Sequence, residues 1–227
     1  MGKEVRMVIA TFDNRISEEE LPYFRGCMIK ESCGNPLFHN HKEDNYNYTY
    51  PLVQYKRDGN RTLMVGIDEG GEAIEALLRD KGNIPCSLGN RKTELQLIGT
   101  RSQIIPIGQT STPHTYTIRG WIPLNSDNYQ SYQQTTSLVE RVKMLEKILT
   151  GNILSFAKGI GVQIDYRIHC SIVQLDEEKP FTYKGIMLKS FTAQFRTNIE
   201  LPDYIGLGKS ISLGKGTIKR EKDGSNR

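Results

Sequence analysis

Histidine, cysteine and tryptophan are scarce in this chain, which holds four, four and one of them among 227 residues. No two cysteines form a Cys-x-x-Cys pair, so the sequence supports neither a zinc ribbon nor a thioredoxin-type site. We therefore expect reduced thiols, with Cys27 and Cys170 packed as small apolar side chains.

Long apolar runs are also missing. None approaches the roughly 18 residues that a membrane-spanning helix needs, and the N-terminal MGKEVRMVIATFD carries charges where a signal peptide needs its apolar stretch. We therefore expect an intracellular, cytoplasmic protein with no membrane partner. The 30 basic and 26 acidic residues leave a net charge of +4, which permits a nucleic-acid partner without requiring one.

A complete nucleotide-binding P-loop is absent from the segment that most resembles one. Gly208-Lys209-Ser210 matches the end of the pattern G-x-x-x-x-G-K-[ST], but Asp203 stands where the first glycine should be. The residues that follow leave no room for a helix whose N-terminus would face a phosphate. The sequence therefore argues against nucleotide hydrolysis at this loop.

Two Gly-x-Gly pairs and several lysines remain in this loop, with no acidic residue between positions 206 and 220. Glycine lets main-chain amides approach an anion, and lysine adds positive charge, so an extended polyanion such as RNA is a suitable ligand. A glycine-rich turn between strands is an equally good interpretation. The RNA-binding candidates are Gly206, Gly208, Lys209, Ser210, Gly214, Lys215 and Gly216.

Hydrophobic patterns in the first half predict the order strand, helix, two strands, helix, strand. Asp58-Gly59 marks the turn of a hairpin, and Ser17 and Glu20 form a capping box before the first helix. This is the order of the split βαβ, or ferredoxin-like, fold that RNA-recognition modules share. The expected elements are strands at 4–13, 50–67 (the hairpin) and 91–105, and helices within 16–35 and 68–80.

The second half reads as a degenerate copy of the first, because a last helix is hard to find. We therefore predict an α+β protein of two tandem ferredoxin-like (RRM-like) β-α-β-β-α-β domains. The expected elements are strands at 114–124, 162–175 and 183–201 and a helical region at 132–161, interrupted at Gly151, with Leu138, Val142, Leu145 and Leu149 on one face. The expected domains are 1–105 and 112–220, followed by a polar tail at 221–227.

His39 and His41 are two residues apart, just beyond the first predicted helix. Side chains two apart in extended chain share a face, so one imidazole can accept a proton and the other donate one at a single bond, without metal. Two other interpretations stay open: a surface loop that happens to contain two histidines, and a metal site that Glu43 or Asp44 helps to complete. His114 and His169 fall in expected strands, where a structural role is favoured.

Tyrosines alternate just after the histidines, at Tyr46, Tyr48 and Tyr50, and Tyr55 follows. Side chains two apart share a face, so these rings can stack on unpaired bases or cover a sheet. Covering the sheet is the favoured interpretation.

Several segments together resemble the CRISPR-associated repeat-processing endoribonucleases of the RAMP superfamily, in the branch with a His-x-His after the first helix. In the first half they are RGCMIKE, LFHNH, YPLVQYK and LMVGIDEG, and in the second GNILSFAKGI and LKSFTAQFRTNIELPDYIGLGKSISLGKGTI. The resemblance covers nearly the whole chain. It implies tandem ferredoxin-like domains that bind the repeat of a precursor CRISPR RNA, with the glycine-rich loop holding RNA.

The resemblance also implies a reaction. Such enzymes cut within each repeat without metal, by attack of a ribose 2′-hydroxyl on the adjacent phosphate, and leave a 2′,3′-cyclic phosphate and a 5′-hydroxyl. The catalytic candidates are then His39 and His41, and no cofactor is expected. Lys30 and Lys56 are candidates for neutralising the phosphate, and an exposed, solvated lysine is the alternative for each.

Two competing functions remain beside the metal-independent endoribonuclease. One is a non-catalytic RNA-binding subunit of the same superfamily, and the other is a metal-dependent enzyme built on His39, His41 and Glu43. A homodimer and a CRISPR interference complex are further partners that the family role would allow.

Overall fold

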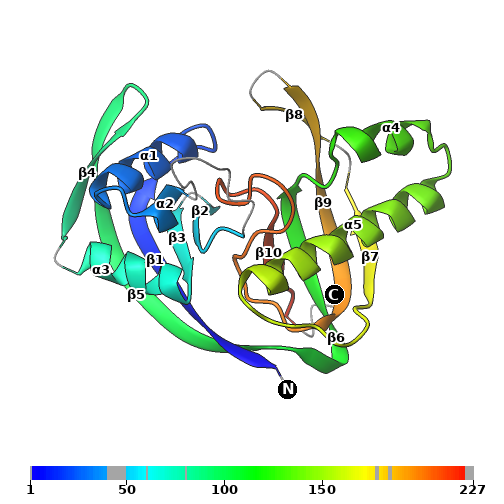
Figure 1. The fold of residues 1–227 in the computed structure, drawn as a ribbon. Helices are drawn as coiled ribbons and strands as arrows, with labels where there is room; N and C mark the ends of the chain where they lie inside the picture. The colour runs from blue at the N-terminus through cyan, green and yellow to red at the C-terminus, as the bar shows by residue number, and fades with distance from the viewer. Residues whose placement is uncertain are drawn as a thin grey trace. The chain divides into compact units, whose positions relative to one another are not determined.

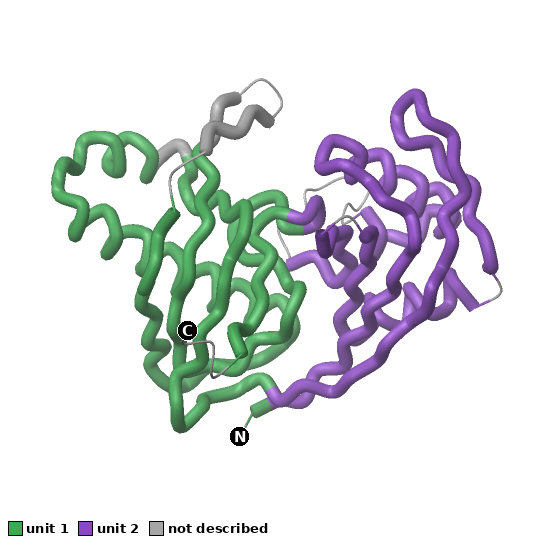
Figure 2. Tube along the Cα trace, turned by 180° about the vertical axis from the view of Figure 1, so that it is seen from behind, with its two compact units in different colours: residues 1–2, 107–211, 215–227 green, residues 3–106, 212–214 purple. Residues whose placement is uncertain are grey.

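The computed structural model of the chain describes residues 2–39, 50–59, 61–79, 81–176, 179–183 and 186–222. It consists of two compact units, drawn in different colours in Figure 2. The N-terminal unit comprises residues 3–106 together with 212–214, and the C-terminal unit comprises 1–2, 107–211 and 215–227.

The N-terminal unit is an antiparallel sheet with helices on one face (Figure 1). Its sheet has the strand order β2-β3-β1-β5-β4, of which the first four give the ferredoxin-like arrangement that the sequence predicts. Its elements are β1 (Lys3–Arg15), α1 (Leu21–Glu31), α2 (Pro36–His39), β2 (Val53–Asp58), β3 (Arg61–Ile67), α3 (Glu69–Leu78), β4 (Asn83–Leu88) and β5 (Arg91–Ile107).

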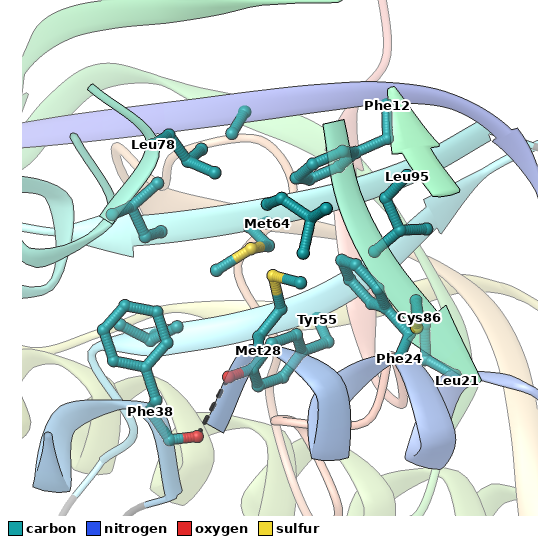
Figure 3. Packing of buried hydrophobic residues seen from close by; sticks show 14 of the residues in the cluster. Phe12, Leu21, Phe24, Met28, Phe38, Tyr55, Met64, Leu78, Cys86 and Leu95 are labelled. Carbon is teal, nitrogen blue, oxygen red and sulfur yellow. Dashed lines mark hydrogen bonds between the residues drawn. The ribbon is translucent and has the colours of Figure 1, made fainter. Parts of the chain in front are cut away.

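Aromatic side chains form the centre of this unit's core (Figure 3). Phe24 of α1 packs edge to face against Phe12 of β1 and Tyr55 of β2, with ring centroids 5.5 and 5.6 Å away. Strand β1 contributes the alternate residues Val8, Ala10 and Phe12, because successive side chains of a strand point to opposite faces of the sheet. The fully or nearly fully buried members include Val8, Ala10, Phe12, Leu21, Phe24, Met28, Phe38, Val53, Tyr55, Met64, Ile74 and Leu78.

The first helix begins later than its capping box predicts. Ser17 N donates to Glu20 Oε2 (2.8 Å) and Glu20 N to Ser17 Oγ (3.3 Å), so the reciprocal bonds exist. They close a turn that precedes the helix, which starts at Leu21 with Pro22 in its first turn. Proline is tolerated there because the first amides of a helix have no partner within it.

The C-terminal unit repeats the same strand arrangement. Its sheet has the order β10-β6-β9-β7, with β8 paired to β9, so the predicted tandem ferredoxin-like fold is confirmed. Residues 223–227 of the predicted polar tail lie outside the described residues. The elements are β6 (Gln109–Trp121), α4 (Ser126–Gln134), α5 (Leu138–Gly159), β7 (Cys170–Leu175), β8 (Lys179–Tyr183), β9 (Ile186–Ile199) and β10 (Thr217–Arg220).

Helix α5 continues through Gly151, so the predicted interruption is wrong. An exposed glycine costs a helix only about 1 kcal/mol relative to alanine, and burial of Leu145, Leu149 and Ile153 outweighs that cost. Leu138 is 68% exposed, so the predicted apolar face begins too early. Among the described residues, no helix combines the length and apolar character needed to cross a bilayer.

The C-terminal unit departs from a complete ferredoxin-like domain after β9, where the sequence also shows no clear last helix. A loop at residues 201–216 connects β9 to β10, and residues 201–222, all described, contain no helix. This confirms that no helix follows Gly208-Lys209-Ser210, as the argument against a P-loop requires. The predicted strand at 162–175 is shorter than expected, since only β7 at its end is extended in a sheet.

Cys27 of α1 and Cys86 of β4 form a disulfide, with Cα atoms 5.6 Å apart, so the expectation of four reduced thiols is wrong. The sequence patterns missed β4, a strand that contains Pro85 and lies at the edge of its sheet, where proline is tolerated. Cys33 and Cys170 are free thiols. Burial raises the pKa of the Cys170 thiol to about 12.

Reduction of the Cys27–Cys86 bond should lower the free energy of unfolding by about 4 kcal/mol, because its sequence separation of 59 closes a long loop in the unfolded chain. Cys27→Ser should show the same low urea midpoint without reductant and no further change in dithiothreitol. Cys33→Ser is the control, since Cys33 is an exposed free thiol. A urea midpoint that changes neither with dithiothreitol nor with Cys27→Ser would contradict a stabilising disulfide.

Candidate functional site

His39 is the last residue of α2, a single helical turn in the N-terminal unit, and its side chain is half-buried. The side-chain oxygen of Asn35 accepts a hydrogen bond from Leu37 N (3.0 Å) at the start of this turn. Phe38 is 2% exposed and packs in the aromatic core. Its burial, worth about 2 kcal/mol, anchors the residue next to His39.

Two side chains hold the C-terminal end of α2. The Tyr55 hydroxyl donates to Phe38 O at 3.0 Å, as drawn in Figure 3, and Arg25 Nη2 donates to His39 O at 2.7 Å. The last carbonyls of a helix have no partner within it, so these two bonds supply what the helix cannot. The main chain at His39 is therefore fixed from α1 by Arg25 and from β2 by Tyr55.

His41 and Glu43 lie outside the described residues, so the arrangement of the predicted histidine pair stays a prediction. The same holds for the metal site that would use both of them with His39. Across the described ranges, no three His, Cys, Asp or Glu side chains are grouped in a way that could hold a metal ion.

The two predicted phosphate-neutralising lysines differ in accessibility. Lys30 is exposed on α1 and lines a hollow of about 500 Å³ together with Lys92 of β5. It lies five residues after Arg25, about 140° around the helix, so it projects from a different side of α1 than the residue that contacts His39.

Lys56 is completely buried in β2, so the alternative of an exposed, solvated lysine is wrong for it. Burial lowers the pKa of its ammonium group to about 7. An ammonium with no exposed surface does not reach a phosphate in this structure. The residues VQYK of β2 are buried on both faces of the sheet, which alternation alone does not reveal.

The tyrosines that the structure describes support the favoured interpretation. Tyr50 and Tyr55 are 7% and 0% exposed, so neither ring is available for stacking on a base. Tyr46 and Tyr48 lie outside the described residues.

The tip of the glycine-rich loop, residues 212–214, belongs to the N-terminal unit. Tyr55 N donates to Ser212 O at 3.0 Å, and Leu213 forms a parallel β-bridge with Tyr55, so the tip extends the sheet beside its edge strand β2. Gly214 has a φ of 79°, and a Cβ there would lie 2.8 Å from Leu21 Cδ2. Glycine is therefore needed for the tip to pack against α1 and β2.

The flanks of the loop lie in the C-terminal unit and are also closely packed. A Cβ at Gly216 would lie 1.9 Å from Leu207 O, and one at Gly208 would lie 2.9 Å from the Trp121 ring. Both glycines have positive φ, at 59° and 97°. The glycine-rich composition thus has a structural cause.

Several of the loop's amides are used within the protein. Leu207 N donates to Gly216 O (2.9 Å), Lys209 N to Ile122 O (3.2 Å), and Gly216 N to Gly120 O (3.1 Å). These amides cannot at the same time hold a phosphate. Of the two predicted lysines, Lys209 is exposed and Lys215 is only 9% exposed, so only the side chain of Lys209 offers a large accessible surface.

His114 makes contacts that fit the predicted structural role. Its Nε2 lies 3.0 Å from Glu200 Oε2, and its Nδ1 lies 2.8 Å from Arg220 Nη2. Because a guanidinium only donates, Nδ1 accepts from Arg220 and Nε2 carries the proton toward Glu200. His169 precedes β7, where its main-chain N donates to Asn198 Oδ1 at 2.7 Å.

Two ferredoxin-like units in tandem, the second with a glycine-rich loop in place of its last helix, define a RAMP-type protein. The family models of the Cas6b N-terminal and C-terminal domains match residues 3–104 and 108–221. The chain therefore belongs to the Cas6b family, and its resemblance to the CRISPR-associated repeat-processing endoribonucleases is confirmed, whereas the His-x-His feature of the branch stays a prediction.

Solved structures share the fold over almost the whole chain. A crystal structure of Cas6b matches 96% of this chain and 100% of its own with a TM-score of 0.86 and 23% identity. A second, described as the CRISPR RNA processing endoribonuclease Cas6b, matches the same shares with a TM-score of 0.74 and 22% identity. The uncharacterized protein MJ0978 of Methanocaldococcus jannaschii is 32% identical over 106 residues, which are 47% of this chain and 71% of that protein.

Replacement of Lys56 by methionine should change how stability depends on pH. The unfolded chain holds this proton up to the ordinary pKa of 10.5, whereas the folded chain releases it near 7, so folding gains stability as pH rises between these values. Lys56→Met should therefore be more stable than the wild type at pH 6, by up to about 4 kcal/mol, and lose most of that advantage by pH 10.

Urea unfolding at the two pH values measures this difference. Lys30→Met, on the exposed surface of α1, should show no such pH-dependent difference. An effect of Lys56→Met that is equal at both pH values would mean that the ammonium is not desolvated in the folded protein.

Proposed function

We propose that this chain is a metal-independent endoribonuclease that cleaves within the repeats of precursor CRISPR RNA. Membership of the Cas6b family is the main support, because one solved protein of similar fold is described as a CRISPR RNA processing endoribonuclease. The assignment of the site is supported by the geometry at His39. Its side chain is half-buried, and its main-chain carbonyl accepts a hydrogen bond at the end of α2.

The proposed reaction uses His39 and His41 as the general base and the general acid. One imidazole removes the proton of a ribose 2′-hydroxyl while that oxygen forms a bond to the adjacent phosphorus. The bond from phosphorus to the 5′-oxygen breaks, and the other imidazolium gives its proton to that leaving oxygen. The products are a 2′,3′-cyclic phosphate and a 5′-hydroxyl, and atoms balance without water or metal.

Accessible positive charge can hold the RNA backbone and neutralise the phosphate. Lys30 and Lys209 are exposed and keep a proposed role in holding the RNA backbone, whereas the burial of Lys56 and Lys215 does not favour it. The competing proposal, an RNA-binding subunit that never cuts, would use the same exposed lysines. The two differ in whether a product forms.

His39→Ala and His41→Ala should each slow single-turnover cleavage of the cognate repeat by about 10²- to 10⁴-fold, the usual contribution of general acid–base catalysis. Binding of the repeat should persist, and wild-type cleavage should continue in EDTA. His114→Ala is the comparison, because its imidazole is engaged by Glu200 and Arg220.

Three other results would each point elsewhere. Tight binding by the wild type with no product would favour the non-catalytic subunit. Loss of cleavage in EDTA that Zn²⁺ or Mn²⁺ restores would favour the metal-dependent enzyme. Full activity of both single variants and of the double variant would remove the two histidines from the mechanism.

Lys209→Ala should weaken repeat binding and leave the cleavage rate at saturating RNA within about twofold. Loss of one phosphate contact should lower the slope of log K against log salt by about 0.7 for a single strand. Lys143→Ala, which removes an exposed lysine of α5, is the control and should change neither quantity. A slower chemical step with unchanged affinity would instead move the active site toward the loop.

A further inference from the structure

Tyr55 lies where three parts of the N-terminal unit meet. Its main-chain N–H donates to Ser212 O of the loop tip, and its ring packs edge to face on Phe24 of α1. Its hydroxyl donates to Phe38 O, one residue before His39 (Figure 3). One residue of β2 thus connects the glycine-rich loop with the turn that carries a proposed catalytic histidine.

The chemistry of the Tyr55 hydroxyl fits a donor to a carbonyl. The side chain has no exposed surface, and burial raises its pKa, which the Arg25 charge lowers only in part. The hydroxyl therefore stays protonated at neutral pH. A buried hydroxyl without an acceptor would cost about 1–3 kcal/mol, so the bond to Phe38 O resists breaking.

Arg25 donates a hydrogen bond to the next main-chain carbonyl, that of His39. Within the part of the chain that the structure describes, its guanidinium forms no ion pair with a carboxylate, and its buried Nε has no hydrogen-bond partner. The interaction that orients this half-buried guanidinium there is its bond to His39 O. A rigid, planar donor on α1 is well suited to fixing the carbonyl direction of the residue that it contacts.

We infer that Tyr55 and Arg25 are positioning residues for His39, and that the loop tip at residues 212–214 holds Tyr55 in register. This inference rests on the proposed function. Neither residue needs to touch RNA: together they fix the main chain from which the His39 imidazole extends. A displacement of about 1 Å at a reacting group can cost about 10²-fold in rate, so two hydrogen bonds at this carbonyl pair suffice to affect the chemical step.

The test compares Tyr55→Phe with the wild type in single-turnover cleavage of the repeat at saturating RNA. The variant keeps the buried ring and loses the bond to Phe38 O, so the cleavage rate should fall about tenfold or more while repeat affinity stays within about twofold. Tyr116→Phe is the matched control. Tyr116 is equally buried, but its hydroxyl accepts from Leu201 N in the C-terminal unit, so the same deletion should leave cleavage within about twofold.

Combination with His39→Ala separates positioning from general destabilisation. If Tyr55 acts through His39, Tyr55→Phe should slow the wild type but leave the residual rate of His39→Ala unchanged. Arg25→Ala should behave in the same way, and Arg25→Lys should recover part of the rate because an ammonium can also donate to His39 O. Equal slowing of the wild type and of His39→Ala would overturn the inference.

The loop tip is tested by Gly214→Ala against Gly151→Ala. The first introduces a Cβ against Leu21 at a positive φ, whereas the second adds one on α5 with nothing within 4 Å. Gly214→Ala should reproduce the Tyr55→Phe loss of rate, and Gly151→Ala should not. Thermal unfolding of each variant above the assay temperature confirms that the rates compare folded proteins.

The outcomes distinguish the two proposals. A wild type that does not cleave, or cleaves equally without His39, contradicts the proposed function. A wild type that depends on His39 but tolerates Tyr55→Phe and Arg25→Ala contradicts the positioning inference alone. A rate loss explained fully by weaker RNA binding would also overturn it, because it would make these residues part of the RNA surface.

Discussion

The edge-to-face packing of Phe24 on Phe12 and Tyr55 is the interaction on which the N-terminal unit depends. It places α1 on the sheet, and α1 then places Arg25 next to the last carbonyl of α2. It also fixes the Tyr55 ring, so that its hydroxyl reaches Phe38 O and its main chain reaches the loop. A four-residue helix is too short to be stable alone, so its geometry is a consequence of this core.

The parts of the fold that local patterns encode were predictable. The hairpin of β2 and β3 follows from Asp58-Gly59 between two apolar runs, and α3 follows from its spaced apolar residues with acids in the first turn. The Cys27–Cys86 bond was not predictable, because it joins residues 59 apart in the sequence. Strand β4 pairs only with the neighbouring β5, but it contains Pro85, and proline weakens a local strand pattern. At Gly151 the local pattern predicts a helix interruption that does not occur. The preference of glycine against a helix is weak, and burial of neighbouring residues outweighs it.

The candidate site was predictable only in part. His39 is proposed from its chemistry and its spacing to His41, which need no tertiary information. The roles of Arg25 and Tyr55 have no sequence signal, because both donate to main-chain carbonyls, which every residue carries. A tyrosine within a strand predicts a covered sheet, and that was correct for Tyr55, but the partner of its hydroxyl depends on where α2 packs. The sequence-based interpretation of Lys56 as an exposed lysine is wrong for a related reason. A charged side chain usually indicates an exposed position, yet β2 is buried on both faces of the sheet.

The glycine-rich loop combines two properties that the sequence presents as alternatives. Its glycines are required sterically, since Gly214 packs on Leu21 and Gly216 on Leu207, and several of its amides bond within the protein. Its exposed Lys209 still offers a charge to a polyanion. A tightly packed loop holds such a charge in a defined place better than a mobile one, because less conformational entropy is lost on binding. The close packing that argues against an amide cradle for phosphate leaves Lys209 as an exposed basic side chain on a loop of fixed main chain. Within the N-terminal unit, the loop tip is joined to Tyr55 through Ser212 O, and Tyr55 in turn to the turn that carries His39.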